Sequence, residues 1–339
     1  MGGESLIRET SSKPVDPYTA AVPSSLGGVP VNVRTSISLR ILAVIALLSV
    51  AAYMSAQVSR TAPDLVPTGK GWGEAVDHSN NANKPGSAKP VGGNGINYHG
   101  GPVMLGTPNI YYIWYGNWSG NTATTILTDF ANNLGGSHYE NINSTYFDGS
   151  NNHVSSLLTY GGLTTDNYSQ GTSVSDAGIQ AIVSSAISGG RLPKDTNGIY
   201  FVLTSADVNE SSGFCTQYCG WHTHGTIGGS DIKYSFVGNP DRCPSACEAQ
   251  SSSSPNGNPG ADGMASVIAH EQEEAISDPD LNAWYDVRGA ENADKCAWTF
   301  GTESTASNGS LYNITLGSRE YLIQRNWVNA SGGICAMSY

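Results

Sequence analysis

Residues 199–204 have the sequence IYFVLT, an uninterrupted run of apolar and β-prone residues. Such a run predicts a central, fully buried strand. Residues 109–115 (NIYYIWY) have the same character and predict a second buried strand. These two stretches indicate a sheet around which the rest of the domain is organised.

Apolar residues at helical spacing predict helices over 122–134, 175–187 and 264–277. Ser175 is the expected N-cap of the second helix and Asp262 that of the third. Pro279 follows the third helix and enforces its end, because proline cannot continue a helix.

Two further stretches, 155–160 and 232–237, are predicted as strands, the latter at an edge of the sheet because its residues alternate. The resulting order, βαβαββα, is typical of a layered α/β domain, here with a mixed sheet. The last 40 residues are expected to be loop-rich with short strands.

The N-terminal region carries an apolar run, ILAVIALLSVAAYMSA at 41–56, preceded by Arg34 and Arg40. It is shorter than the ~20 residues of a membrane span and suits the apolar core of an export signal. We therefore expect residues 1–56 to be an export signal or an uncleaved signal anchor. Residues 57–93, rich in Pro and Gly, are expected to form a linker or pro-region before a domain at 94–339. Both alternatives predict a secreted domain, attached to a membrane only if the apolar run stays uncleaved.

The net charge of the 339-residue chain is −12, from 16 Lys and Arg against 28 Asp and Glu. This balance argues against a nucleic-acid-binding protein, which needs a basic face. Eight of the acidic residues lie between Glu271 and Asp294, with Arg288 as the one basic residue there. The local excess indicates a bound cation, the alternative being a solvated acidic helix face.

The segment Val267–Asp280 contains the motif H-E-x-x-E. His270 and Glu274 are one helical turn apart and share a face, so both side chains can hold one Zn²⁺. Glu271 stands where the general base lies in H-E-x-x-H metallopeptidases, so a zincin-like arrangement is expected. Glu274 replaces the second histidine of that motif, which is a departure from the zincin pattern.

The remaining metal ligand has several candidates. Asp280 lies ten residues after His270, the offset of the third ligand in metzincins, and Asp278 is close to the helix end. Glu291 and Asp294 come next and could reach the same ion after a chain reversal. Zn²⁺ is the expected metal, with Ca²⁺ as the alternative because most of these ligands are oxygens.

A second constellation is the H-x-H pair His222 and His224, which follows Cys219. In an extended segment both side chains point to one face, where one of them could complete the metal site. The favoured interpretation is an exposed loop beside a disulfide. Nucleophile-elbow, phosphate-loop and dinucleotide-binding motifs are not found in the sequence.

The six cysteines all lie in the last 125 residues, and four of them form two C-x3-C pairs. In an exported chain this pattern favours disulfides over a cysteine-ligated zinc site. They are Cys215, Cys219, Cys243, Cys247, Cys296 and Cys335.

A series of motifs in a distinctive order resembles the EXORDIUM, or phosphate-induced protein 1, family across 94–339. They are YHGGPV at 98–103, WYG at 114–116, CGWH at 219–222, FVGNP at 236–240, PNG at 255–257 with GADGM at 260–264, and NAWY at 282–285. The resemblance implies a secreted or cell-wall protein. In plants such proteins are extracellular growth regulators, and the family brings no established catalytic activity.

The chain departs from the plant pattern, whose members generally lack the H-E-x-x-E helix. It resembles microbial-type members, in which His270, Glu271 and Glu274 accompany Glu291-x-x-Asp294 and Cys296, a combination similar to secreted metallopeptidases. This resemblance favours Glu291 and Asp294 over Asp280 as ligands. The growth role of the plant proteins is therefore not transferred.

Two functions are compatible with these features. The first is a secreted zinc hydrolase of the peptidase type, with a peptide or cell-wall polymer as substrate. The second is a non-catalytic extracellular or cell-wall binding protein whose acidic cluster holds a structural metal. We further predict a Cys296–Cys335 disulfide, with the two C-x3-C pairs linked among themselves.

Overall fold

The computed structural model describes residues 65–70 and 95–339. The apolar run at 41–56 lies outside the described residues. Within the described ranges, none of the helices has the length and apolar character needed to cross a membrane.

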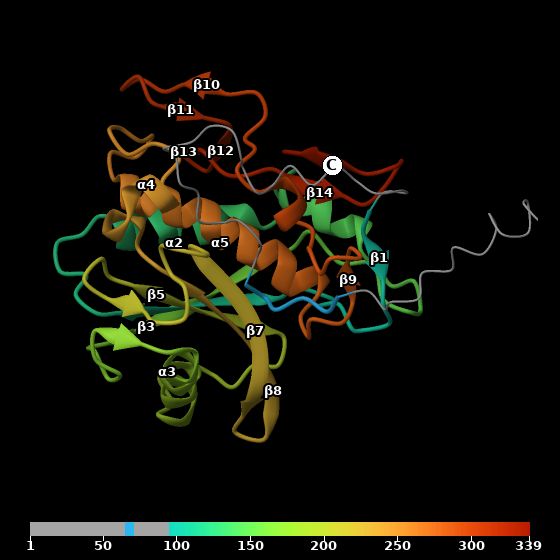
Figure 1. Cartoon of the computed structure of the whole chain (residues 1–339), viewed down its shortest axis with the longest axis horizontal. Coiled ribbons are helices and arrows are strands. Elements are labelled where there is room, and N and C mark those ends of the chain that lie inside the picture. The colour runs from blue at the N-terminus through green and yellow to red at the C-terminus, as the bar shows by residue number, and fades with distance from the viewer. Residues whose placement is uncertain (1–64, 71–94) are drawn as a thin grey trace, which may run out of the picture. The chain divides into compact units, whose positions relative to one another are not determined.

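A five-stranded mixed sheet forms the centre of the domain, in the order β3-β2-β5-β8-β7 (Figure 1). Its strands are β2 (Asn109–Tyr115), β3 (Thr159–Asp166), β5 (Gly198–Thr204), β7 (Gly220–Ile227) and β8 (Ser230–Val237). Neighbouring strands are parallel except β7 and β8, which are antiparallel. Every residue of β5 is buried, so the predicted central strand and mixed α/β class are confirmed.

Helices cover both faces of the sheet. In Figure 1, α2 (Ala123–Leu134) and α5 (Pro259–Ser277) lie on one side and α3 (Asp176–Ser188) lies on the other. The apolar residues whose spacing predicted α2 form its buried face, since Ile126, Leu127 and Phe130 are at most 1% exposed. Helix α5 packs against both α2 and β7, which places the H-E-x-x-E motif between two layers.

Short elements complete the domain. They are the strands β1 (Asn97–Tyr98), β4 (Ser173–Val174), β6 (Asn209–Glu210), β9 (Trp284–Tyr285), β10 (Ser304–Thr305), β11 (Leu311–Tyr312), β12 (Ile314–Leu316), β13 (Arg319–Tyr321), β14 (Asn326–Val328) and β15 (Ile334–Ala336), the helix α4 (Pro244–Cys247) and the 3-10 turns η1 (Glu140–Thr145), η2 (Pro240–Arg242) and η3 (Asp294–Cys296). The strands from β10 onward form two-stranded hairpins, so the loop-rich C-terminal part is confirmed.

The structure corrects several local predictions. Strand β8 is not at the edge but lies between β5 and β7, because the turn at Gly228 and Gly229 folds β7 back against it. Strand β3 covers Thr159–Asp166 instead of 155–160, since the parallel register with β2 begins at Thr159.

Helix α5 also begins earlier than expected. Asn258, and not Asp262, is its N-cap and accepts a hydrogen bond from the Ala261 amide. Asp262 lies inside the first turn, where it accepts a hydrogen bond from the Asn256 amide. By contrast, the Ser175 cap of α3 is confirmed, because its hydroxyl accepts from the Gly178 amide.

All six cysteines lie in the described part of the chain and all are in disulfides. Cys296 pairs with Cys335 as predicted, and the two C-x3-C pairs are joined as Cys215–Cys243 and Cys219–Cys247. The alternative of a cysteine-ligated zinc site is therefore wrong. The Cys219–Cys247 bond ties the start of β7 to helix α4.

Candidate metal centre

His270 and Glu274 face each other on helix α5, as their spacing predicts. The Nε2 atom of His270 lies 3.0 Å from Oε1 of Glu274. Both side chains are buried, with the histidine wholly inaccessible and the carboxylate at 1% exposure. The H-E-x-x-E motif therefore points into the domain and does not form a solvated acidic face.

A second histidine approaches the same carboxylate from the sheet. His222 on β7 is fully buried, and its Nε2 atom lies 3.7 Å from Oε2 of Glu274. The same nitrogen is 3.2 Å from Oε1 of Glu291. Glu274 consequently stands between two imidazoles that come from a helix and from a strand.

The turn at Glu291 and Asp294 supplies two more carboxylates. Asp294 Oδ1 lies 3.5 Å from His270 Nε2, and the Asp294 amide donates to Glu274 Oε1 at 3.0 Å. The Glu291 amide donates to Asp294 Oδ2 at 3.1 Å, which fixes the two side chains relative to each other. We call His222, His270, Glu274, Glu291 and Asp294 the inner cluster.

The inner cluster forms two overlapping groups with metal-ligand geometry. In one group His222 combines with Glu274 and Glu291, and in the other His270 combines with Glu274 and Asp294. In each group one potential ligand atom per residue lies within 4.8 Å of the others. Each group offers one imidazole nitrogen and two carboxylate oxygens, a donor set that suits Zn²⁺ better than Ca²⁺, which takes an all-oxygen shell.

Burial shifts the pKa values of these groups, and for His222 the shift favours metal binding. It lowers the pKa of His222 to about 3, with further contributions from the charges of His270 and His224. The imidazole is then neutral at pH 7, the state that binds a metal. Burial, followed by the neighbouring carboxylates with Glu274 first, raises the pKa of Glu291 well above its usual range. A cation among these carboxylates would relieve that repulsion.

Glu271 is buried beside the inner cluster but belongs to neither ligand group. A Cβ atom at Gly220 would lie 3.3 Å from Oε1 of Glu271 and 2.6 Å from Val267. The glycine at the start of β7 thus leaves room for this carboxylate between helix and strand. The charge of Glu271 also contributes to the raised pKa of Glu291, so Glu271 interacts electrostatically with a residue of the inner cluster.

Asp278 has a different position from the ligands. Its Oδ1 atom accepts hydrogen bonds from the amides of Asn282 and Ala283, both at 2.6 Å. Burial raises the pKa of Asp278 to about 6. The side chain closes the turn after α5 and belongs to neither buried ligand group.

Asp280 and His224 meet outside the inner cluster. Together with Asp231 they form a third group near the β7–β8 turn. In this group the side chain of Asp280 is 20% exposed and that of His224 is 37% exposed. Lys233 forms ion pairs with both carboxylates of this group, at 2.5 Å to Asp280. A cationic side chain therefore already neutralises it, and the structure does not bring Asp280 to His270.

His222 corrects the interpretation of the H-x-H segment as an exposed loop. The segment is strand β7, in which His222 is fully buried and its side chain lies near Glu274 of α5. The H-x-H alternation itself was the signal for the strand. It was weak because Gly, Thr and His offer few of the apolar residues that mark a buried strand.

The sequence analysis missed a buried carboxyl pair behind the inner cluster. Glu140 in η1 accepts a hydrogen bond from Gln272, and Glu273 accepts one from Asn326. Burial raises the pKa of Glu140 to about 8 and that of Glu273 well above its usual range, the latter also because of the Glu140 charge. The pair is therefore protonated on at least one carboxyl at neutral pH.

Replacing Glu140 with glutamine is expected to make the domain less sensitive to alkaline pH. Between its unfolded value of 4.5 and its folded value of about 8, the folded chain binds the extra proton, so the free energy of unfolding falls as pH rises. Glu140→Gln keeps the shape without the charge. It should stabilise the protein at pH 8 by up to about 5 kcal/mol, since the pKa rises by about 3.5 units at ~1.4 kcal/mol per unit.

Urea unfolding at pH 5 and pH 8 measures this difference. Glu303→Gln, an exchange at an exposed glutamate, is the matched control and should leave the pH dependence unchanged. Equal pH dependence in Glu140→Gln and the native chain would contradict a proton held by the pair.

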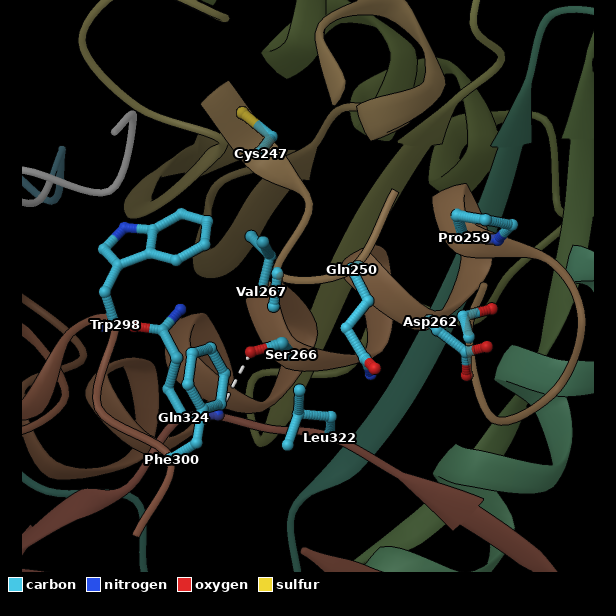
Figure 2. A pocket seen from close by; sticks show the side chains of 13 residues that line it. Cys247, Gln250, Pro259, Asp262, Ser266, Val267, Trp298, Phe300, Leu322 and Gln324 are labelled. Carbon is cyan, nitrogen blue, oxygen red and sulfur yellow. Dashed lines mark hydrogen bonds between the residues drawn. The ribbon is translucent and has the colours of Figure 1, made fainter. Parts of the chain in front are cut away.

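A small pocket lies on another side of α5, lined by Ser266, Val267, Trp298 and Gln324 among others (Figure 2). The backbone N–H of Gln324 donates a hydrogen bond to the Ser266 hydroxyl in this pocket, at 3.1 Å. Its volume of about 20 Å³ has room for roughly one water molecule. It is too small for a substrate, so the inner cluster is the stronger candidate site.

The fold and the inner cluster together define a disulfide-bonded α/β domain with a buried histidine–carboxylate centre. The family model for the phosphate-induced protein 1 conserved region matches residues 96–330. The chain therefore belongs to the EXORDIUM, or phosphate-induced protein 1, family.

Relatives in Arabidopsis thaliana support this assignment. Protein EXORDIUM-like 3 is 32% identical over 271 residues, covering 68% of this chain and 80% of the relative. Protein EXORDIUM-like 5 is 32% identical over 273 residues, covering 68% and 75%. Protein EXORDIUM is 27% identical over 232 residues, covering 58% and 70%. No solved structure matches the chain.

Proposed function

We propose that this protein is a secreted zinc-dependent hydrolase that acts on peptides. The observation that supports this function best is the convergence of His222 from the sheet on the His270–Glu274 pair of the helix. Glu274 thereby lies between an imidazole from the helix and an imidazole from the sheet. The family membership and the export-type run at 41–56 support the extracellular location.

In this proposal His222, His270 and Glu274 would close around the zinc as its three protein ligands and leave the fourth position to water, with Glu291 and Asp294 beside them. Zinc lowers the pKa of a bound water to about 7, which supplies the nucleophile for hydrolysis. Glu271 follows His270 directly and is buried beside the ligands, so it is our candidate for the base that accepts the proton of that water. A peptide is the favoured substrate, and a cell-wall polymer is the alternative.

Replacing Glu271 with glutamine is expected to abolish hydrolysis while zinc stays bound. The amide retains the shape of the side chain but cannot accept a proton, and loss of a general base typically costs 10²–10⁴-fold in rate. The measurement is cleavage of a peptide library at pH 7, with zinc content determined on the same samples. Glu303→Gln serves as the surface control and should keep full activity.

Two outcomes would overturn the catalytic proposal. One is a native rate in Glu271→Gln, which would exclude this residue as the base. The other is a native protein that contains stoichiometric zinc but cleaves none of the peptides.

The second candidate function is a non-catalytic extracellular or cell-wall binding protein with a structural metal. The observation that favours it is the burial of the inner cluster, in which His222, Glu274 and Glu291 are at most 2% exposed. Structural zinc sites are closed, whereas catalytic ones keep a position open for water and substrate. A melting temperature that rises with Zn²⁺ or Ca²⁺, without hydrolysis of peptides, would support this function.

A further inference from the structure

Residues 65–70 (LVPTGK) lie against the outer edge of β7, although they precede the first strand of the domain by more than 25 residues. We call this segment the strap. The Gly69 carbonyl accepts a hydrogen bond from the His222 amide at 3.0 Å, on the side of β7 away from β8. At its other end the Leu65 amide donates to the Val287 carbonyl at 3.2 Å. In Figure 1 the strap is the blue segment beside β7.

These two contacts attach the strap to the backbone of two segments near the inner cluster. His222 belongs to β7, while Val287 lies in the segment that leads to Glu291. Within the strap, Pro67 and Gly69 are buried while Val66 and Thr68 are exposed, the alternation of an extended chain lying on a sheet edge. Residues 66–68 follow this alternation, and the chain bends at Gly69.

The fit at Gly69 is too close for any side chain. Its φ of +66° is in the left-handed region, and a Cβ atom there would lie 1.9 Å from the His222 carbonyl oxygen. Only glycine allows the backbone to approach β7 at this point. The position opposite His222 therefore selects glycine.

The next residue, Lys70, is held by a set of polar and aromatic groups. Its Nζ atom is 2.6 Å from Asp176 Oδ2 and 2.6 Å from the Ser212 hydroxyl. It also lies over the rings of Tyr218 and Trp221, at 5.2 and 5.4 Å from their centroids. A carboxylate with two aromatic faces is a recognition site for a cationic side chain.

We propose that the outer edge of β7 is the peptide-binding edge of this protein, and that the strap occupies it as an internal inhibitory ligand. The edge takes a peptide through a backbone hydrogen bond to the His222 amide, with glycine opposite His222 and a basic residue next to it. The proposal rests on the proposed function, because it names the substrate class of the same site.

The test uses the full chain with Lys70→Glu, which places a negative charge against Asp176 and releases the strap. The probe is a fluorescently labelled LVPTGK peptide, and its binding is followed by fluorescence anisotropy. A tethered segment competes at an effective concentration of the order of millimolar. Lys70→Glu is therefore expected to bind the peptide at least tenfold more tightly than the native chain, and Lys70→Ala should show a smaller change in the same direction.

Lys194→Glu is the matched control, because it makes the same charge change at an exposed lysine outside the strap. It should bind the peptide as weakly as the native chain. An LVPTGE peptide should bind none of the variants, since it lacks the cation that Asp176 recognises. Equal affinity of LVPTGK for Lys70→Glu, Lys70→Ala and the native chain would overturn the proposal.

This experiment is independent of metal and catalysis. Tight peptide binding by Lys70→Glu in a protein without hydrolytic activity would support the binding edge and overturn the hydrolase. Glu271-dependent hydrolysis without any gain of peptide affinity in Lys70→Glu would support the hydrolase and overturn the strap as its inhibitor.

Discussion

Replacing His222 with alanine is expected to remove stoichiometric zinc from the protein. His222 lies between Glu274 and Glu291 and is the imidazole that the sheet contributes to the inner cluster. Even changes in the groups that only orient metal ligands cost roughly 10–100-fold in affinity, so loss of a ligand should cost at least 100-fold. The measurement is zinc content after dialysis, together with a zinc titration against a competing chelator.

His224→Ala is the matched control for this experiment. His224 is two residues along the same strand, but it lies in the partly exposed group with Asp231, Asp280 and Lys233. Zinc content should be unchanged in this variant. Equal zinc affinity in both variants would contradict the inner cluster as the metal site, and a loss confined to His224→Ala would move the site to the outer group.

The stability gained from bound metal provides a second readout. A ligand that binds only the folded state stabilises it by about 2.7 kcal/mol at 100 times its dissociation constant. The melting temperature of the native chain and of His224→Ala should therefore rise on zinc addition. His222→Ala should show no such rise at the same zinc concentration.

Removing the Cys296–Cys335 disulfide is expected to lower both the stability of the protein and its affinity for zinc. The bond closes a separation of 39 residues, for which chain entropy predicts about 4 kcal/mol. Cys296 ends the turn η3 that begins at Asp294, so the bond also holds a carboxylate of the inner cluster in place. Cys296→Ala/Cys335→Ala should lose both stability and zinc affinity, measured by urea unfolding and by zinc titration.

The double variant Cys215→Ala/Cys243→Ala provides the comparison. Its bond closes a separation of 28 residues, so the entropic loss should be of similar size, again about 4 kcal/mol. Neither cysteine adjoins a residue of the inner cluster in the sequence, and zinc affinity should remain at the native level. Equal loss of zinc affinity in both double variants would show that general destabilisation, and not the position of Asp294, is responsible.

Burial of the inner cluster bears on both proposed functions. A structural site would stay closed throughout, whereas a hydrolase needs a route for substrate to His222 and Glu271. In the proposed exchange, a competing peptide would replace the contacts of the strap with β7 and Asp176, which are hydrogen bonds and an ion pair at the surface.

The local sequence pattern was sufficient to predict those helices and strands whose buried residues are neighbours along the chain. The runs at 109–115 and 199–204 are strands, and the apolar spacing of 122–134 is a helix, because periodicity is a property of neighbouring residues. The same reasoning placed His270 and Glu274 on one helix face, one turn apart. The cysteines were similarly predicted to form disulfides, with Cys296 bonded to Cys335, but the prediction did not say which cysteine of one C-x3-C pair bonds which of the other.

Tertiary structure alone decided which distant residues meet. The strand that carries His222 is polar, so its burial against α5 depends on contacts between segments about 50 residues apart. The same packing directed Asp280 to Lys233 instead of His270, and it laid the strap on β7 although its Pro and Gly residues suggested a linker or pro-region. Helical and strand periods govern neighbours along the chain, whereas a site built from a helix, a sheet edge and a turn is determined only when these elements pack together.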